Sequence, residues 1–147
     1  MMIAGIATIF LSGVIIVNNM HSSHPEPAPV SVNVNHSDYT IITGICQHYQ
    51  LYSYKAESER ELREFAELLN SLEFVRSSVR DAGRSQPLMI YLYRENGTYD
   101  VIRADYGGLC LVHVGEIWEV WQIADESLER LRDYIIEKDI EQRGNSG

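Results

Sequence analysis

The sequence predicts an α+β domain: a five-stranded antiparallel sheet with two helices on one face, preceded by an N-terminal transmembrane helix. Three observations lead to this prediction. The first 17 residues contain no charged side chain. Two later stretches repeat apolar residues at helical spacing. Between these stretches lie short strand-like runs separated by glycine-containing turns. The expected order is β-α-β-β-β-β-α, and a length of 147 residues indicates one folded domain.

Residues 1–20 are predicted to be a membrane anchor. An apolar run to Val17, at ~1.5 Å per residue, spans roughly 25 Å and nearly matches the hydrocarbon core of a bilayer. A cleaved signal peptide is the alternative, but the run has no basic start and no A-x-A-like cleavage site. We therefore expect the bilayer as a partner. Ala4, Thr8 and Ser12 share the small-residue spacing that would allow self-association through the anchor.

Residues 21–37 are predicted to be a Pro-rich linker. Pro25, Pro27 and Pro29 block regular hydrogen-bonded structure and favour an extended spacer. All twelve Lys and Arg residues lie at Lys55 or beyond, so no basic residue before it opposes translocation. We expect residues 38–141 to form the globular domain, outside the cytoplasm, and residues 142–147 to be a disordered tail.

The first half of the domain is predicted to be one strand followed by one helix. Residues 39–54 alternate apolar side chains in the pattern of a half-buried strand. Ser58 and Glu61 then have the spacing of a capping box, in which each side chain bonds the other's backbone N–H. Leu62 and Phe65 begin a helical apolar stripe, and we expect the helix to end between residues 71 and 74.

The second half is predicted to be four strands and a helix. We expect strands over residues 88–94, 98–104, 109–114 and 117–123, joined by turns too short for anything but antiparallel pairing. Asn96-Gly97 is typical of a type I′ hairpin turn, because both central residues of that turn need positive φ. Asp125 is the expected N-cap of the last helix, whose apolar stripe includes Leu128 and Leu131.

This element order is similar to that of helix-grip architectures, including the TATA-box-binding-protein-like fold, and to part of cystatin-like folds. The segments FAELLNSLEF (65–74) and WQIADESL (121–128) resemble small membrane-anchored extracytoplasmic domains of Gram-positive bacteria. The resemblance covers roughly residues 58–136 and rests on ordinary helix and strand patterns. It implies the anchored domain organisation and no known chemistry.

Cys46 and Cys110, the only cysteines, are both expected in strands. Outside the cytoplasm they could form a disulfide, worth roughly 4 kcal/mol in a chain-entropy estimate, or they could be buried thiols. With His48 and His113 they could also supply four zinc ligands, but Cys110 and His113 should point to opposite faces of their strand. No P-loop, G-x-S-x-G, HExxH or dinucleotide-binding motif is present. We expect no enzyme activity, no metal and no cofactor.

Aromatic residues in the predicted strands are the candidate binding residues. A net charge of -9 repels phosphate backbones and argues against nucleic acid as a partner. Aromatic side chains favour protein recognition when exposed, although tyrosine also simply suits strands. We expect a non-enzymatic module that binds a protein or cell-envelope component. The alternative is an inhibitor or immunity-type protein that acts on a membrane-associated enzyme. The predicted partner surface is Tyr52, Tyr54, Tyr91, Tyr93, Trp118 and Trp121.

Overall fold

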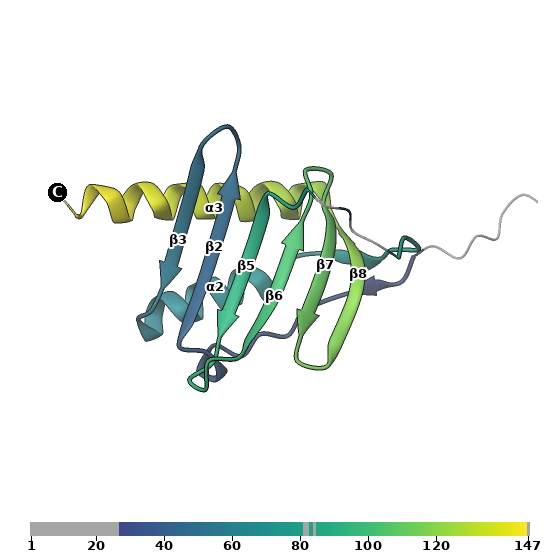
Figure 1. Cartoon of the computed structure of the whole chain (residues 1–147), viewed down its shortest axis with the longest axis horizontal. Helices are drawn as coiled ribbons and strands as arrows, with labels where there is room; N and C mark the ends of the chain where they lie inside the picture. The colour runs from purple at the N-terminus through teal and green to yellow at the C-terminus, as the bar shows by residue number, and fades with distance from the viewer. Residues whose placement is uncertain (1–26, 81–82, 84, 147) are drawn as a thin grey trace, which may run out of the picture.

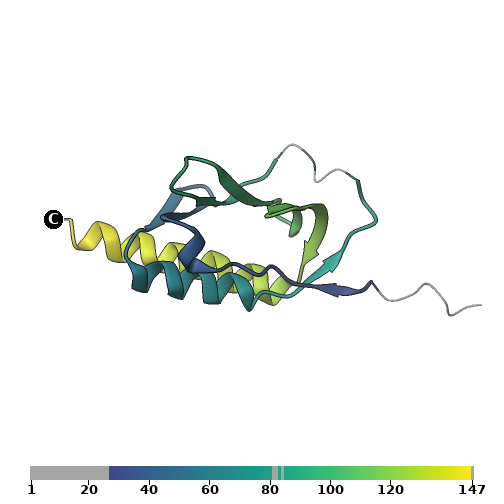
Figure 2. The ribbon, with the colours of Figure 1, turned by 90° about the horizontal axis from the view of Figure 1, so that it is seen from below.

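An antiparallel sheet forms one layer of the structure, and two helices form a second layer on one of its faces (Figures 1 and 2). The computed structural model describes residues 27–80, 83 and 85–146. Within them the sheet has eight strands in the order β1-β4-β8-β7-β6-β5-β2-β3. The strands are β1 (Pro29–Val30), β2 (Ile41–Gln47), β3 (Leu51–Ala56), β4 (Phe74–Arg76), β5 (Leu88–Tyr93), β6 (Tyr99–Ala104), β7 (Leu109–Val114) and β8 (Ile117–Ile123). The helices are α2 (Glu59–Asn70) and α3 (Asp125–Gly144), with a 3₁₀ turn, η1, at His36–Asp38.

The predicted five-stranded sheet is therefore wrong: the α+β class and antiparallel pairing hold, but three strands were missed. Residues 39–54 are not one strand, because a turn after Gln47 folds them into the β2–β3 hairpin. Tyr49 makes that turn with a φ of 64°, which an aromatic residue rarely adopts. β1 and β4 are two and three residues long, so neither has a detectable alternation of its own. Each is defined by its neighbours, β4 by β8 and β1 by β4.

The predicted transmembrane helix over residues 1–20 lies outside the described residues, and within them no helix is long and apolar enough to cross a membrane. The predicted linker differs from the structure from Pro29 onward, where the chain joins the domain. Val32 and Val34 are buried in the core. The Asn70 amide holds this segment on α2, accepting from the Val34 N–H at 2.6 Å and donating to its carbonyl at 2.9 Å.

The two helices differ in how their ends are fixed. The predicted capping box of α2 is confirmed: Ser58 Oγ accepts from the Glu61 N–H at 3.3 Å, and the Glu61 carboxylate accepts from the Ser58 N–H at 3.1 Å. The Ser58 hydrogen bonds also lower the pKa of Glu61. Helix α3 starts after Ala124, without a side-chain cap, and continues through Gly144 into the predicted disordered tail.

The last turns of α3 contact β3 through side chains. Asp139 accepts from the Ser53 N–H at 3.2 Å, and the Gln142 amide donates to the Lys55 carbonyl at 2.9 Å. Arg143 donates to the carbonyl of Leu51 at 3.0 Å. The predicted domain end at 141 is therefore too early, because residues 142 and 143 bond directly to the sheet.

The β5–β6 turn lies where Asn96-Gly97 predicted it, but its type differs. The Gly97 N–H donates to the Arg94 carbonyl at 3.0 Å, and the Arg94 N–H donates to the Thr98 carbonyl at 2.8 Å. Only Gly97 has positive φ, at 83°, so this is a type I turn followed by a glycine bulge, not a type I′ turn. The β6–β7 turn repeats this arrangement, with Gly108 in the glycine position.

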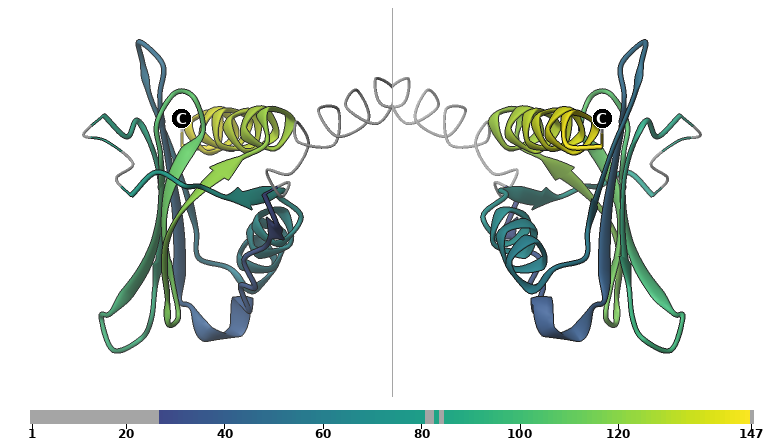
Figure 3. Two further views of the ribbon diagram at one scale, coloured as in Figure 1. Left: turned by 90° about the vertical axis from the view of Figure 1, so that its right-hand side faces the viewer. Right: turned by 90° about the vertical axis from the view of Figure 1, so that its left-hand side faces the viewer.

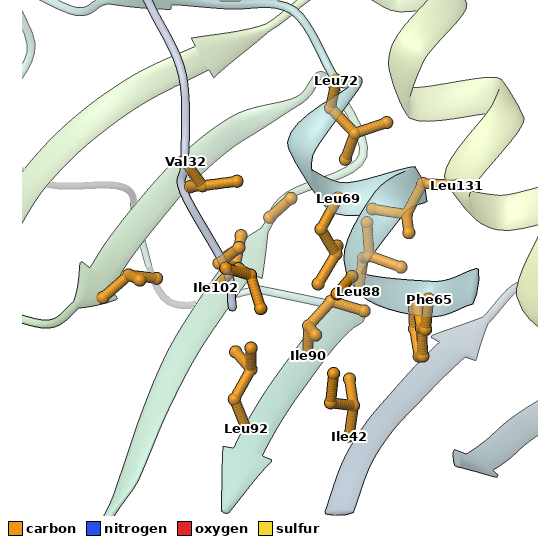
Figure 4. Packing of buried hydrophobic residues seen from close by; sticks show 14 of the residues in the cluster. Val32, Ile42, Phe65, Leu69, Leu72, Leu88, Ile90, Leu92, Ile102 and Leu131 are labelled. Carbon is orange, nitrogen blue, oxygen red and sulfur yellow. The ribbon is translucent and has the colours of Figure 1, made fainter. Parts of the chain in front are cut away.

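The core lies between the helices and one face of the sheet. Phe65 and Leu69 of α2 and Leu131 of α3 pack against strand residues such as Ile90 (Figure 4). Both helices stand on the same side of the sheet (Figure 3). Gly44 in β2 lets both helices pack closely on the sheet, because a Cβ there would lie 2.8 Å from Ile135 Cγ1 and 2.9 Å from Phe65 Cζ.

Candidate functional site: the open face of the sheet

The sheet face opposite the helices is the candidate functional site, and we call it the open face. Alternate residues of each strand point to it, and the strand registers place them in rows. Figures 2 and 3 show that neither helix covers this side. One row consists of Thr43, Tyr91, Val101, His113 and Trp118. The next consists of Ile45, Met89, Arg103, Leu111 and Val120.

Aromatic rings dominate one part of the open face. The ring centroids of Tyr91, Tyr93 and Tyr99 lie 5.6–6.1 Å from one another. His113 and Trp118 form an edge-to-face pair with centroids 4.7 Å apart, and Trp118 is 61% exposed. These rings sit on the regular backbone of a sheet, so they present a flat apolar surface with little conformational freedom to lose on binding.

The open face carries no carboxylate at its strand positions, although the chain has 21 Asp and Glu residues. Its cations are Lys55, which pairs with Glu57 at 2.8 Å, and Arg103. The guanidinium carbon of Arg103 lies 5.7 Å from the centroid of the Tyr91 ring. The Nε of Arg103 is buried and has no hydrogen-bond partner among the described residues.

A cavity of about 290 Å³ opens beside Trp118, where β7 and β8 meet the segment after β4. Its apolar lining includes Leu111, Val120 and Val79, and its rim carries two arginines. Arg76 pairs with Glu119 at 3.3 Å, and this carboxylate also accepts from Trp121 Nε1 at 2.7 Å. Arg80 is exposed and has no ion pair with any described residue. The cavity thus combines an apolar floor with one cation, Arg80, that no described residue pairs.

A larger cavity, of about 470 Å³, lies between β1, β4 and the C-terminal end of α2. Its lining mixes apolar residues with uncharged polar ones, and Glu73 is the one charged residue among them. It adjoins no exposed aromatic cluster. We therefore favour the open face, where aromatic surface, a cavity and cations without an ion pair among the described residues occur together.

The predicted partner residues divide between the two faces. Tyr91, Tyr93 and Trp118 lie on the open face. Tyr54 and Trp121 are both only 2% exposed and face the helices. Tyr52 also lies on the helix side, where its hydroxyl donates to Gln50 at 2.6 Å. Strand parity is the reason, because Trp118 and Trp121 are an odd number of residues apart.

The predicted list of partner residues did not include Tyr99, Arg103, Leu111 or His113. A signal for them was available in the alternation of residues 99–103 and in the hairpin that places Tyr99 opposite Tyr93. Following that register through β7 would also have brought Leu111 and His113 to the same face.

The two cysteines are free and buried on the helix face. Cys46 lies in β2 and Cys110 in β7, with β5 and β6 between them. Three strand spacings of ~4.8 Å separate them by roughly 14 Å, far beyond the reach of a disulfide. The disulfide alternative therefore fails and the buried-thiol alternative holds. The zinc arrangement also fails, because His113 lies on the open face and the described residues contain no group of three or more metal ligands.

Asp100 is the centre of a buried polar cluster on the helix side. It is 1% exposed, accepts from the Tyr39 hydroxyl at 2.6 Å and pairs with Arg94. The guanidinium of Arg94 also lies over the Tyr39 ring at 5.1 Å. Burial, followed by the hydrogen bond to Asp100, raises the pKa of Tyr39 well above its ordinary value. The cluster ties the chain before β2 to the β5–β6 hairpin, so we interpret it as structural.

Comparisons with protein-family models, with curated proteins and with solved structures find no match. The resemblance to small anchored domains of Gram-positive bacteria stays a prediction. The function must therefore be argued from the open face itself.

Proposed function

We propose that this chain is a non-enzymatic binding module that docks a protein or cell-envelope component on its open face. The supporting observation is the gathering of exposed aromatic rings on one sheet face, Tyr99 beside Tyr91 and Tyr93 and Trp118 beside His113, with Trp118 also lining the cavity. Large exposed apolar patches on a protein surface mark sites of interaction with proteins, membranes or ligands. The predicted bilayer contact of residues 1–20 and a location outside the cytoplasm are part of the same proposal.

The cysteines support a binding role over thiol catalysis. Burial raises the pKa of the Cys110 thiol to about 12 and also raises that of Cys46. Catalysis by a cysteine needs the thiolate, which is favoured near cations or helix N-termini and not in an apolar core. Neither thiol therefore has the environment of a nucleophile.

The β2–β3 hairpin favours a second candidate, an inhibitor or immunity-type protein. Tyr49 at its tip is fully exposed and has left-handed backbone geometry. Its ring lies 5.2 Å from that of His48, and His48 lies 6.2 Å from Tyr106. An exposed aromatic on a strained turn is typical of a residue held ready for a partner. Such a tip could enter the cleft of an enzyme.

Site-specific photocrosslinking tests the two candidates against each other. The photoreactive residue p-benzoylphenylalanine would replace Trp118, Tyr49 or the exposed helix residue Glu129 in cells that make the protein. We expect a discrete crosslinked species from position 118 and none from position 129. A species from position 49 alone would favour the inhibitor candidate. Identical patterns at all three positions would contradict both.

A further inference from the structure

Arg103 is the one charged group in the middle of the open face. It lies in β6 with Met89 and Leu111 as its neighbours on the adjacent strands. Its Nε is buried without an acceptor among the described residues, and its guanidinium carbon lies over the Tyr91 ring, 5.7 Å from the centroid. Arginine has five N–H donors, and buried donors in proteins are normally satisfied. The terminal Nη groups make no hydrogen bond with a described residue and are not among the buried unpartnered atoms, so an acceptor from outside would bond them and not Nε.

The surroundings of Arg103 suit an anionic group. The open-face strand positions contain no carboxylate to compete for the guanidinium, although the chain as a whole is strongly acidic. Glu119 lines the neighbouring cavity but is already engaged by Arg76 and Trp121. Arg80 on the cavity rim adds a second cation without an ion pair among the described residues.

The cavity beside Trp118 lies close enough to Arg103 to be filled by the same ligand. Leu111 is the cross-strand partner of Arg103 and also lines the cavity. Arg103 and the cavity floor are thus roughly 5–10 Å apart, one to two strand spacings. Two or three residues of an extended peptide cover that distance.

We propose that the open face binds an acidic peptide segment of another protein. A carboxylate of that segment would pair with Arg103, and an aromatic or aliphatic side chain two or three residues away would enter the cavity beside Trp118. The planar guanidinium matches a carboxylate in a two-bond arrangement. A nucleic acid does not fit, because it presents a phosphate at every nucleotide and the open face and its cavity offer only a few cations to pair with them. This inference rests on the proposed function.

The test starts with a displayed library of random twelve-residue peptides, selected on the full chain after depletion on a Trp118→Ala variant. We expect the recovered peptides to be enriched in Asp or Glu close to an aromatic or aliphatic residue. Fluorescence anisotropy then gives their affinity for wild type, Arg103→Met, Arg103→Lys and Lys55→Met. The Lys55→Met variant removes an open-face cation that already has an internal partner, so it is the matched control. Circular dichroism checks that each variant is folded.

We expect Arg103→Met to weaken binding at least tenfold, Arg103→Lys less, and Lys55→Met by less than twofold. Changing the peptide Glu to Gln should weaken binding to wild type by the same factor. It should not weaken binding to Arg103→Met any further. Peptides that need Trp118 but show no acidic enrichment and bind Arg103→Met normally would overturn this inference and leave the proposed function standing. Failure to recover any peptide that distinguishes wild type from Trp118→Ala would overturn both.

Discussion

The two faces of the sheet are made from the same strands, yet one is covered by helices and the other is not. Ile42, Ile90 and Val112 point to the helices and are fully buried, whereas Tyr91 and His113, adjacent to Ile90 and Val112 in sequence, point the other way and remain half exposed. Helices α2 and α3 complete the packing of the first face, whereas no described helix or strand covers the second, on which the segment after β4 lies only beside Trp118. Folding stability should therefore depend on one face and recognition on the other.

Thiol chemistry should show the largest difference between the faces. Cys46 and Cys110 lie on the helix face, so reaction with a thiol reagent should require unfolding and be suppressed roughly a thousandfold or more relative to the denatured chain. A Ser53→Cys variant, which adds a thiol on the opposite face, should react rapidly in the native protein. Absorbance after addition of Ellman's reagent measures both rates. Rapid native reaction of the two buried thiols would contradict the assignment of the faces.

Alkaline pH should destabilise the helix face through Cys110. Burial raises its folded-state pKa from the ordinary 9.0 to about 12. The folded state thus holds a proton that the unfolded state releases. The contribution of this thiol to the free energy of unfolding is therefore fully present below pH 9 and falls as pH rises from 9 toward 12. Urea unfolding between pH 8 and 10.5 should show this decline in wild type and a shallower one in Cys110→Ala. Equal slopes would exclude the thiol as the cause.

The two tryptophans provide the next comparison. Trp121 is buried against Phe74, with ring centroids 5.5 Å apart, so Trp121→Ala should lower the free energy of unfolding by about 3–5 kcal/mol. Trp118 is mostly exposed, and Trp118→Ala should cost less than about 1 kcal/mol. Urea unfolding followed by circular dichroism measures both. Similar losses for the two variants would show that the open face also supports the fold.

Replacing Asp100 should lower the free energy of unfolding by a smaller but clear amount. Its replacement by Ala leaves the Tyr39 hydroxyl without its acceptor and Arg94 without its ion pair, so we expect a loss of about 2–3 kcal/mol. Glu95, an exposed acid in the neighbouring turn, is the control, and Glu95→Ala should be nearly neutral. Thermal unfolding of both variants provides the measurement. A neutral Asp100→Ala variant would show that the cluster does not hold the hairpin.

Gly44 and Thr43 are adjacent in β2 but point to opposite faces. Gly44→Ala should cost about 1–2 kcal/mol, because the new methyl group meets Ile135 and Phe65 at under 3 Å. Thr43→Ala on the open face should change the free energy of unfolding by less than about 0.5 kcal/mol. The midpoints of urea unfolding compare them directly. A Thr43→Ala loss larger than that of Gly44→Ala would reverse the assignment.

The smallest expected effect on stability is that of Arg103→Met. Among the described residues the guanidinium has no acceptor to lose, and methionine keeps an unbranched apolar chain on the Tyr91 ring. We expect a change within about 0.5 kcal/mol, measured by the same unfolding experiment. A large loss would mean that Arg103 has a structural role, and the proposed peptide contact would then lose its basis.

Local signals account for the parts of the fold that the sequence predicts. The capping box of α2 and the glycine turns between β5 and β8 each depend on a few adjacent residues. Strands β1 and β4 could not be predicted in this way, because they are strands only through pairing with partners distant in sequence. The β2–β3 turn was missed because Tyr49 takes a conformation that usually indicates glycine or asparagine.

In the candidate site, too, some features depend on adjacent residues and others on pairing between distant strands. The presence of strand aromatics was predictable, but their faces required the register of each strand. Counting parity alone separates Trp118 from Trp121. Placing Arg103 beside Tyr91 and Leu111 needs three strands at once, and that pairing extends across two hairpins.

The side chains that α3 places on β3 also affect whether this edge strand can pair with a strand of another molecule. β3 ends the strand order, and a terminal strand of this kind has outward N–H and C=O groups that can template pairing with another molecule. Asp139, Gln142 and Arg143 occupy several of these groups. Shortening the chain at Lys138 should expose them, and a rise in thioflavin-T-positive aggregates with protein concentration would reveal it. We therefore expect the end of α3 to protect this protein from polymerising through its own sheet.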